Sequence, residues 1–175
     1  MATQKWVIDI LHSEVQFKVK HLAISNVSGT FKTFIGQVHT ENDDFNNAEI
    51  NFELDTNSID TNNLERDNHL KSDLFLNADK FPKITFNGKL IKSRKKWQLD
   101  GNLTILVTTK PVSLNVDYTG IGTGRHNDTR AGFEIEGKIN RKDFGLTFNL
   151  LTEAGSLVVG EEVKLHFDIE IILKS

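Results

Sequence analysis

Apolar and polar residues alternate along most of the chain. In the first clear run, Val15, Phe17 and Val19 occupy one face of an extended segment, and glutamine and lysine residues occupy the other. The same alternation recurs in residues 48–55, 112–119, 131–139 and 162–171. A period of two is typical of a β-strand with one buried face and one solvated face. The pattern therefore predicts antiparallel strands that either close around their own apolar interior or pack on a second sheet.

Two dipeptides, Asn87-Gly88 and Asp100-Gly101, have the composition of tight hairpin turns. A turn at Asp100-Gly101 would move Leu103 and Ile105 to the face that carries the polar residues before the turn. An unbroken strand keeps them on the same face as Leu99. The register therefore favours a continuous strand with Gly101 at a bend or a close approach. We expect continuity through Asn87-Gly88 as well.

One segment, from Ser58 to Leu76, lacks the alternation. It contains two N-cap candidates, Asp60 and Thr61, and predicts a helix of two to three turns that ends near Ser72.

The expected architecture is all-β, with about eight strands and this one short helix between the third and fourth strands. We expect a single domain over residues 1–175, a glycine-rich loop over residues 120–129 and an irregular stretch over residues 141–145. Twelve phenylalanines and only two prolines suit such a fold. A closed barrel of eight strands can be filled by side chains or can hold one small ligand, and the alternation does not distinguish the two.

Composition and charge exclude several classes of protein. A formal charge of -3 is not that of a dedicated nucleic-acid-binding protein. The absence of cysteine excludes disulfides, thiolate metal sites and cysteine nucleophiles. No apolar run has the roughly 18 residues of a membrane span, and the first residues do not have the pattern of a secretory signal. We therefore expect a cytoplasmic protein as the chain stands, or a periplasmic one if a signal has been removed.

Candidate chemistry is sparse. The six histidines lack the spacing of a metal site, so no metal is expected. His21 continues the inward face of its strand and is either a hydrogen-bonded rim residue or a ligand contact. Arg66 and His69 share one face of the expected helix, where they either bind an anion or belong to a solvated surface. No serine lies in a hydrolase nucleophile motif, so no catalytic site is expected.

Nine segments together resemble the YceI-like family. They occur in the family's order and span nearly the whole chain. These are WVID (6–9), HSEVQFKVKHL (12–22), VSGTF (27–31), DTNSIDT (55–61), RDNHLKS (66–72), FPKITF (81–86), GNLTI (101–105), KPV (110–112) and RKDFG (141–145).

The resemblance implies a lipocalin-like antiparallel barrel, commonly a homodimer, whose apolar lumen accommodates a polyisoprenoid or a similar long amphiphile. It implies no catalytic activity and no cofactor other than a bound polyisoprenoid or isoprenoid quinone. Many members of the family carry a secretory signal, and we expect none in this chain as it stands.

We therefore expect a non-enzymatic protein that binds, carries or sequesters a long isoprenoid or fatty chain. The alternatives are an enzyme or stress-response factor that acts on a lipid or quinone in the barrel, and a ligand-free dimeric interaction module. The alternation predicts that the ligand chain contacts Phe17, Val19, Phe52, Phe86, Leu103, Ile105, Leu114, Phe133 and Ile135. We expect a polar head group at the mouth, near His21, Arg66, His69 and Arg141.

Overall fold

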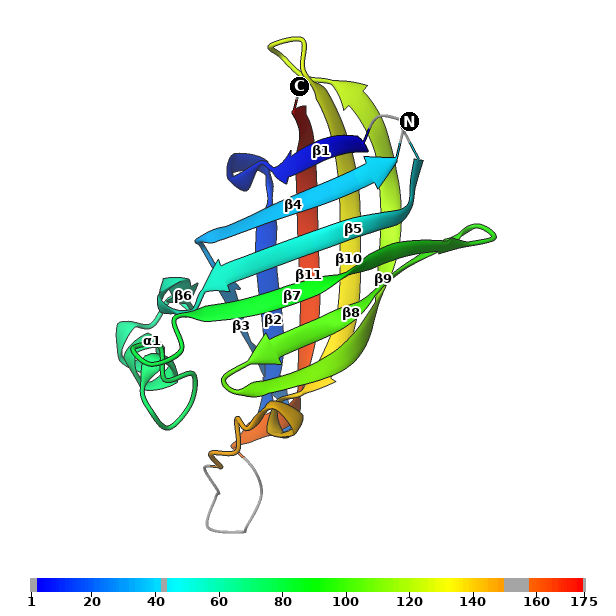
Figure 1. Ribbon diagram of the computed structural model, residues 1–175. Helices are drawn as coiled ribbons and strands as arrows, with labels where there is room; N and C mark the ends of the chain where they lie inside the picture. The colour runs from blue at the N-terminus through cyan, green and yellow to red at the C-terminus, as the bar shows by residue number, and fades with distance from the viewer. Residues whose placement is uncertain (1–2, 42–43, 150–157, 175) are drawn as a thin grey trace.

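The computed structural model describes residues 3–41, 44–149 and 158–174, which form mainly antiparallel strands (Figure 1). The strands are β1 (Thr3–Ile8), β2 (Glu14–His21), β3 (Ser25–Phe31), β4 (Phe34–Glu41), β5 (Asp44–Asp55), β6 (Ile59–Asp60), β7 (Lys83–Ser93), β8 (Lys96–Ile105), β9 (Thr108–Thr123), β10 (Thr129–Asn140) and β11 (Val159–Lys174). The helices are the α-helix α1 (Leu64–Lys71) and the 3₁₀ turns η1 (Ile10–His12), η2 (Thr56–Ser58) and η3 (Arg141–Phe144).

Eight of these strands close into a barrel. Their order is β1-β4-β5-β7-β8-β9-β10-β11, and β11 pairs back with β1. In chain order, α1 lies between the third and fourth strands of this ring, β5 and β7. The expected eight-stranded antiparallel barrel with one short helix is confirmed.

The other three strands, β2, β3 and β6, extend from one edge of β11. Residues 171–174 of β11 pair with β1, and residues 159–168 pair with β2 along the same edge. The turn η1 carries the chain from β1 to β2 between these two stretches. The alternation gave about eight strands because β3, with the polar sequence SNVSGTF, and the two-residue β6 have no clear apolar face.

Strands β7 and β8 run without interruption through both Asn87-Gly88 and Asp100-Gly101, which confirms the predicted continuity. Gly88 and Gly101 lie directly opposite each other. A Cβ atom on Gly101 would lie only 2.6 Å from the Cα atom of Gly88. The two glycines are therefore required by the close approach of two backbones.

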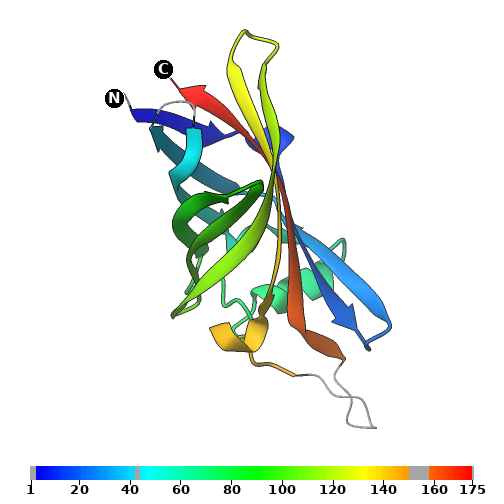
Figure 2. The same ribbon diagram turned by 90° about the vertical axis from the view of Figure 1, so that its right-hand side faces the viewer.

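The expected loop over residues 120–129 is shorter in the structure, because β9 continues to Thr123 and β10 begins at Thr129. The register of the two strands shifts between Gly132 and Phe133, and this bulge lets the pairing continue beyond the barrel. Figures 1 and 2 show the resulting hairpin projecting at the end that holds the chain termini. The glycines in this segment did not indicate whether its residues would continue the pairing of β9 with β10.

The helix lies within the expected range, but its N-cap is neither Asp60 nor Thr61. Asn63 caps it, and its side-chain oxygen accepts a hydrogen bond from the Arg66 backbone N–H. Thr61 instead donates to Asp67, which is buried on the helix. The helix begins later than expected because Asn63, in an extended conformation, supplies the cap.

Four aromatic residues fill the end of the barrel near which both chain termini lie, and we call them the aromatic plug. They are Trp6, Phe45, Tyr118 and Phe133. The ring centroid of Phe45 lies 5.1 Å from that of Trp6 and 5.3 Å from that of Phe133. The indole N–H of Trp6 donates to Thr40 at 3.3 Å, so burial leaves this polar group paired. In the part of the chain that is described, no helix has the length and hydropathy to cross a membrane.

Candidate ligand-binding cavity

A cavity of about 250 Å³ lies inside the barrel. Thirty-four described residues line it, and only two of them, Gln16 and Arg141, have polar side chains. Gln16 lies between two inward-facing positions of β2, and its amide donates to Glu14 at 2.8 Å. The surface that faces the cavity is apolar throughout, so Arg141 lines it with its hydrocarbon stem, and the wall suits an apolar ligand.

Ten of the thirteen residues expected to contact a ligand line this cavity. They are Phe17, Val19, Phe52, Phe86, Leu103, Ile105, Leu114, Phe133, Ile135 and Arg141. The other three, His21, Arg66 and His69, do not line it. The alternation therefore identified the apolar wall, whereas the placement of the polar residues depended on loops and on the helix.

Many of the cavity-lining side chains are only half-buried, and we call one group of them, on three neighbouring strands, the open wall. It comprises Phe17 and Val19 of β2, Ile135 of β10, and Leu165 and Phe167 of β11. These strands are neighbours, and Phe17 lies directly opposite Leu165. Apolar surface that faces water inside the barrel raises the free energy of the folded protein. A long apolar chain in the cavity would remove that cost.

Arg141 begins η3 and is only 3% exposed. Its five N–H groups have five acceptors, at 2.6–3.3 Å, namely the carbonyl oxygens of Leu146, Phe148, Val159 and Gly160 and the side-chain oxygen of Asn149. Burial lowers the pKa of the guanidinium from its ordinary value. The side chain therefore fixes residues 146–149 against the start of β11. A ligand head group at Arg141 would have to displace one of these bonds.

Arg66 and His69 lie on α1, outside the lumen. The Arg66 guanidinium donates to the side chain and the carbonyl of Thr61, at 2.8 and 2.6 Å. The exposed ring of His69 packs edge-on against Phe75 and Phe148, with centroids 5.3 and 5.4 Å away. Both residues thus connect α1 with neighbouring segments at this end of the barrel. Whether they also contact a head group stays a prediction.

His21 is the last residue of β2, is half-buried, and pairs with Ser25 of β3 and Val159 of β11. It lies at the end of the strand, as expected. Its ligand contact stays a prediction.

The alternation missed four cavity residues outside the strands, namely Leu70, Phe75, Leu76 and Leu146. Leu70 lies on α1, Phe75 and Leu76 follow it, and Leu146 follows η3. A two-residue period carries no information about the direction of side chains in helices and loops. The sequence did contain one signal for these cavity residues: they are apolar residues in otherwise polar segments.

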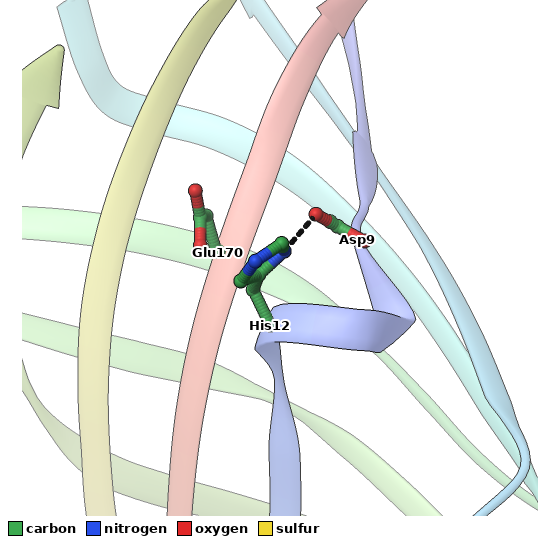
Figure 3. A group of neighbouring side chains, drawn as sticks. All are labelled: Asp9, His12 and Glu170. Carbon is green, nitrogen blue, oxygen red and sulfur yellow. Dashed lines mark hydrogen bonds and ion pairs between the residues drawn. The ribbon is translucent and has the colours of Figure 1, made fainter. Parts of the chain in front are cut away.

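A polar cluster lies on the outside of the barrel where β1, η1 and β11 meet. Figure 3 shows His12 turned toward Asp9, with Glu170 on the neighbouring strand; the His12 and Asp9 side chains are 2.6 Å apart. One donor atom from each of the three lies within 4.8 Å of the others, as in a metal site. However, Arg130 donates to Asp9 at 2.6 Å and to Glu170 at 3.2 Å. The guanidinium thus already supplies the positive charge between these carboxylates.

The charges in this cluster stabilise one another. Burial opposes ionisation of Asp9, but hydrogen bonds from His12 and Arg130 outweigh it and lower the pKa of the Asp9 carboxyl. Asp128, Asp9 and Glu170 together raise the pKa of Arg130. The cluster therefore fastens η1 to β10 and β11 through charged groups.

Comparison with known proteins agrees with the fold. Residues 6–171 match the YceI-like domain family. Protein YceI of Salmonella newport is 40% identical over 160 residues, which cover 91% of this chain and 81% of that protein. The crystal structure of the Campylobacter jejuni YCEI protein has a TM-score of 0.75 and 31% identity, and the alignment covers 90% of this chain and 91% of that one.

Two more distant structures show the same fold. Burkholderia cenocepacia BcnA has a TM-score of 0.80 and 20% identity, over 93% of this chain and 98% of that one. A polyisoprenoid binding domain from Saccharophagus degradans has a TM-score of 0.68 and 16% identity, over 97% of this chain and 98% of that one.

Proposed function

This chain belongs to the YceI-like family, and from that membership and the lining of its cavity we propose that the barrel binds, carries or sequesters a long-chain apolar ligand. The ligand class is a polyisoprenoid, an isoprenoid quinone or a fatty chain. The observation that carries the proposal is the composition of the cavity wall, where Arg141 and Gln16 are the only polar residues among the 34 described ones. A neighbour with the same fold is named as a polyisoprenoid binding domain, which supports the same ligand class.

The energetics favour a ligand that is mostly hydrocarbon. Each buried CH₂ group contributes roughly 0.8 kcal/mol, so a chain of many carbons needs few polar contacts. In this proposal the chain covers the open wall and its polar head remains at the end of the barrel that holds α1 and η3. His21, Arg66, His69 and Arg141 are the head-group candidates at that end.

Binding rather than catalysis is the better-supported role. An enzyme that acts on the enclosed lipid would need polar or ionisable groups beside the reacting atoms. Of the described lining residues, only Gln16 and Arg141 are polar, and the donors of Arg141 are committed to backbone and amide oxygens. The homodimer that the family resemblance implies is part of this proposal.

Two adjacent residues of β2 provide a matched test. Val19 lines the cavity, and Lys20 is exposed on the other face of the strand. Val19→Trp fills part of the cavity and should weaken uptake of an apolar fluorescent probe by about tenfold or more. Lys20→Trp should leave uptake unchanged. The competitor in the same titration is a long-chain polyprenol.

Mass spectrometry of an organic extract from natively purified protein identifies the bound class directly. A long-chain lipid in the wild-type extract, reduced in Val19→Trp, supports the proposal. Equal probe uptake by both tryptophan variants, or failure of polyprenol to displace the probe, contradicts it. Circular dichroism checks that both variants keep the strand content of the wild type.

A further inference from the structure

Large apolar side chains are exposed in the turns at the end of the barrel that holds α1 and η3. Leu22 and Ile24 belong to the turn between β2 and β3, and Val107 belongs to the turn between β8 and β9. Ile24 and Val107 are each 81% exposed. Leu64, the first residue of α1, and Leu74, which follows α1, are exposed as well. Figures 1 and 2 show α1 and both turns at the end opposite the chain termini. Exposed apolar residues gathered at one end are typical of a surface that binds a partner.

The turn between β2 and β3 has an unusual composition for its backbone. The Ile24 N–H donates to the His21 carbonyl at 3.2 Å, and the two residues between them, Leu22 and Ala23, have φ values of 52° and 60°. A hairpin turn with two left-handed residues favours asparagine and glycine, which adopt this conformation at little cost. Leucine and alanine are less favourable here, and two of the apolar side chains in the turn face water. The composition of the turn therefore does not serve the stability of the free protein.

This turn lies beside one end of the cavity. The Leu22 N–H donates to the Val158 carbonyl at 2.8 Å, immediately before β11 begins. Val159, the first residue of β11, lines the cavity, as do Leu70 of α1 and Leu146 after η3. A partner that covered the turn would therefore lie next to the part of the cavity wall that α1 and η3 form.

Lysines surround the same turn on the outer face of the sheet. Lys18 and Lys20 precede it on β2, and Lys18 lies directly opposite Lys164 of β11, which lies directly opposite Lys138 of β10. All four are exposed, and at about 3.3 Å per residue the two on β2 lie roughly 7 and 13 Å from the turn. Within the described residues, only Lys138 among them has an ion pair, with Glu162 at 3.7 Å. Like charges directly opposite each other destabilise a sheet, so an anionic partner would relieve this repulsion.

Apolar side chains at a tip with lysines behind them match the boundary of an anionic lipid bilayer. We propose that this end of the barrel docks on the surface of such a bilayer. Leu22, Ile24 and Val107 enter the boundary between head groups and acyl chains, and the lysines contact the anionic head groups. The inference rests on the proposed function in one respect: an apolar ligand could then pass between the bilayer and the barrel without crossing water.

The β2–β3 turn, rather than α1, leads this contact. On the side of α1, exposed Glu65 follows Leu64 and exposed Asp73 precedes Leu74. These carboxylates are repelled by anionic head groups, whereas the β2–β3 turn has lysines beside it. The barrel therefore tilts toward the membrane on the side of β2.

Vesicle flotation tests the docking. Wild-type protein should bind vesicles of phosphatidylcholine and phosphatidylglycerol at about 0.05 M salt, and should bind far less at about 0.5 M salt or to phosphatidylcholine alone. Ile24→Asp removes an inserted side chain and should weaken binding about tenfold or more. Lys18→Glu should weaken it about fivefold or more on the anionic vesicles.

The opposite end of the barrel provides matched controls. Ile121, on β9, is an exposed apolar residue there, and Lys96 is exposed at the start of β8. Ile121→Asp and Lys96→Glu should bind vesicles like the wild type, and circular dichroism checks the fold of every variant. A wild type that does not bind anionic vesicles at low salt, as expected if the turn serves a protein partner, overturns the inference. Binding that Ile24→Asp and Lys18→Glu retain, or that the controls lose equally, overturns it as well.

Probe uptake separates this inference from the ligand proposal. Ile24 does not line the cavity, so Ile24→Asp should take up the apolar probe from solution like the wild type, but should take it up more slowly from anionic vesicles that carry it. Val19→Trp should do the reverse, losing uptake while still binding vesicles. Failure of vesicle binding with normal uptake contradicts the docking alone, and failure of uptake with normal vesicle binding contradicts the ligand proposal alone.

Discussion

The two ends of the barrel interior differ in how completely their apolar side chains are covered. In the aromatic plug, Trp6 is 0% and Phe45 2% exposed. In the open wall, Phe17, Leu165 and Phe167 are only half-buried, although they alternate with polar residues in the same way. Burial therefore depends on what faces a strand from across the barrel.

The source of the difference is visible in the neighbours of Phe45. Its ring centroid lies within 5.1–5.5 Å of those of Trp6, Tyr118 and Phe133, which come from three different strands. At the open wall, the Phe17 ring has Phe31 as its aromatic neighbour at 5.5 Å, and the cavity lies beside it. The plug stabilises the fold, and in the proposed function the wall provides surface for a ligand.

Truncation in the two regions should separate these roles. Phe45→Ala removes a fully packed ring and should lower the free energy of unfolding by about 3–5 kcal/mol. Phe167→Ala should lower it by less than about half as much, because that ring already borders a cavity, and should weaken probe uptake. Urea unfolding monitored by circular dichroism measures both. Equal losses of stability would show that the wall is packed in solution.

The second prediction concerns the buried cation at the open end. Arg141→Met leaves several buried oxygens without donors and should lower the free energy of unfolding by about 2–4 kcal/mol. Lys142→Met is the control, because its ion pair with Glu161 at 3.0 Å is partly exposed and contributes about 1 kcal/mol or less. Denaturation of both variants gives the comparison. A small effect of Arg141→Met would mean that residues 146–149 do not depend on this side chain.

The smallest effect is expected on the outer surface, where Asp9 connects η1 to Arg130. The pKa of Asp9 is lowered in the folded protein. The ionised carboxylate therefore stabilises the fold at pH values above its ordinary pKa of about 3.9. This stabilisation is lost as the pH falls through the pKa of the folded protein. Asp9→Asn should therefore cost about 1 kcal/mol or less at neutral pH, and the cost should shrink as the pH falls below the ordinary pKa of the carboxyl. Thermal unfolding across this range measures the difference. A difference that grows toward low pH would have the wrong sign.

Much of the cavity wall could be predicted because it lies on regular strands. Alternation alone placed Phe52, Leu114 and Ile135 on the inner face, where the structure has them. The surroundings of Arg66 and Arg141 could not be predicted, because their partners lie in turns and in the first residues of β11. Side-chain hydrogen bonds of that kind leave no periodic trace in the sequence.

The sequence by itself determined the alternation of faces, the all-β class and the continuity of β7 and β8, because these follow from the two-residue period of an extended backbone. Only the tertiary structure decided that β1 and β2 share one edge of β11, and that like charges on β2, β11 and β10 form rows. Those features depend on the register between strands far apart in the chain. Register is set when the apolar faces close into a barrel, and no single strand contains that information.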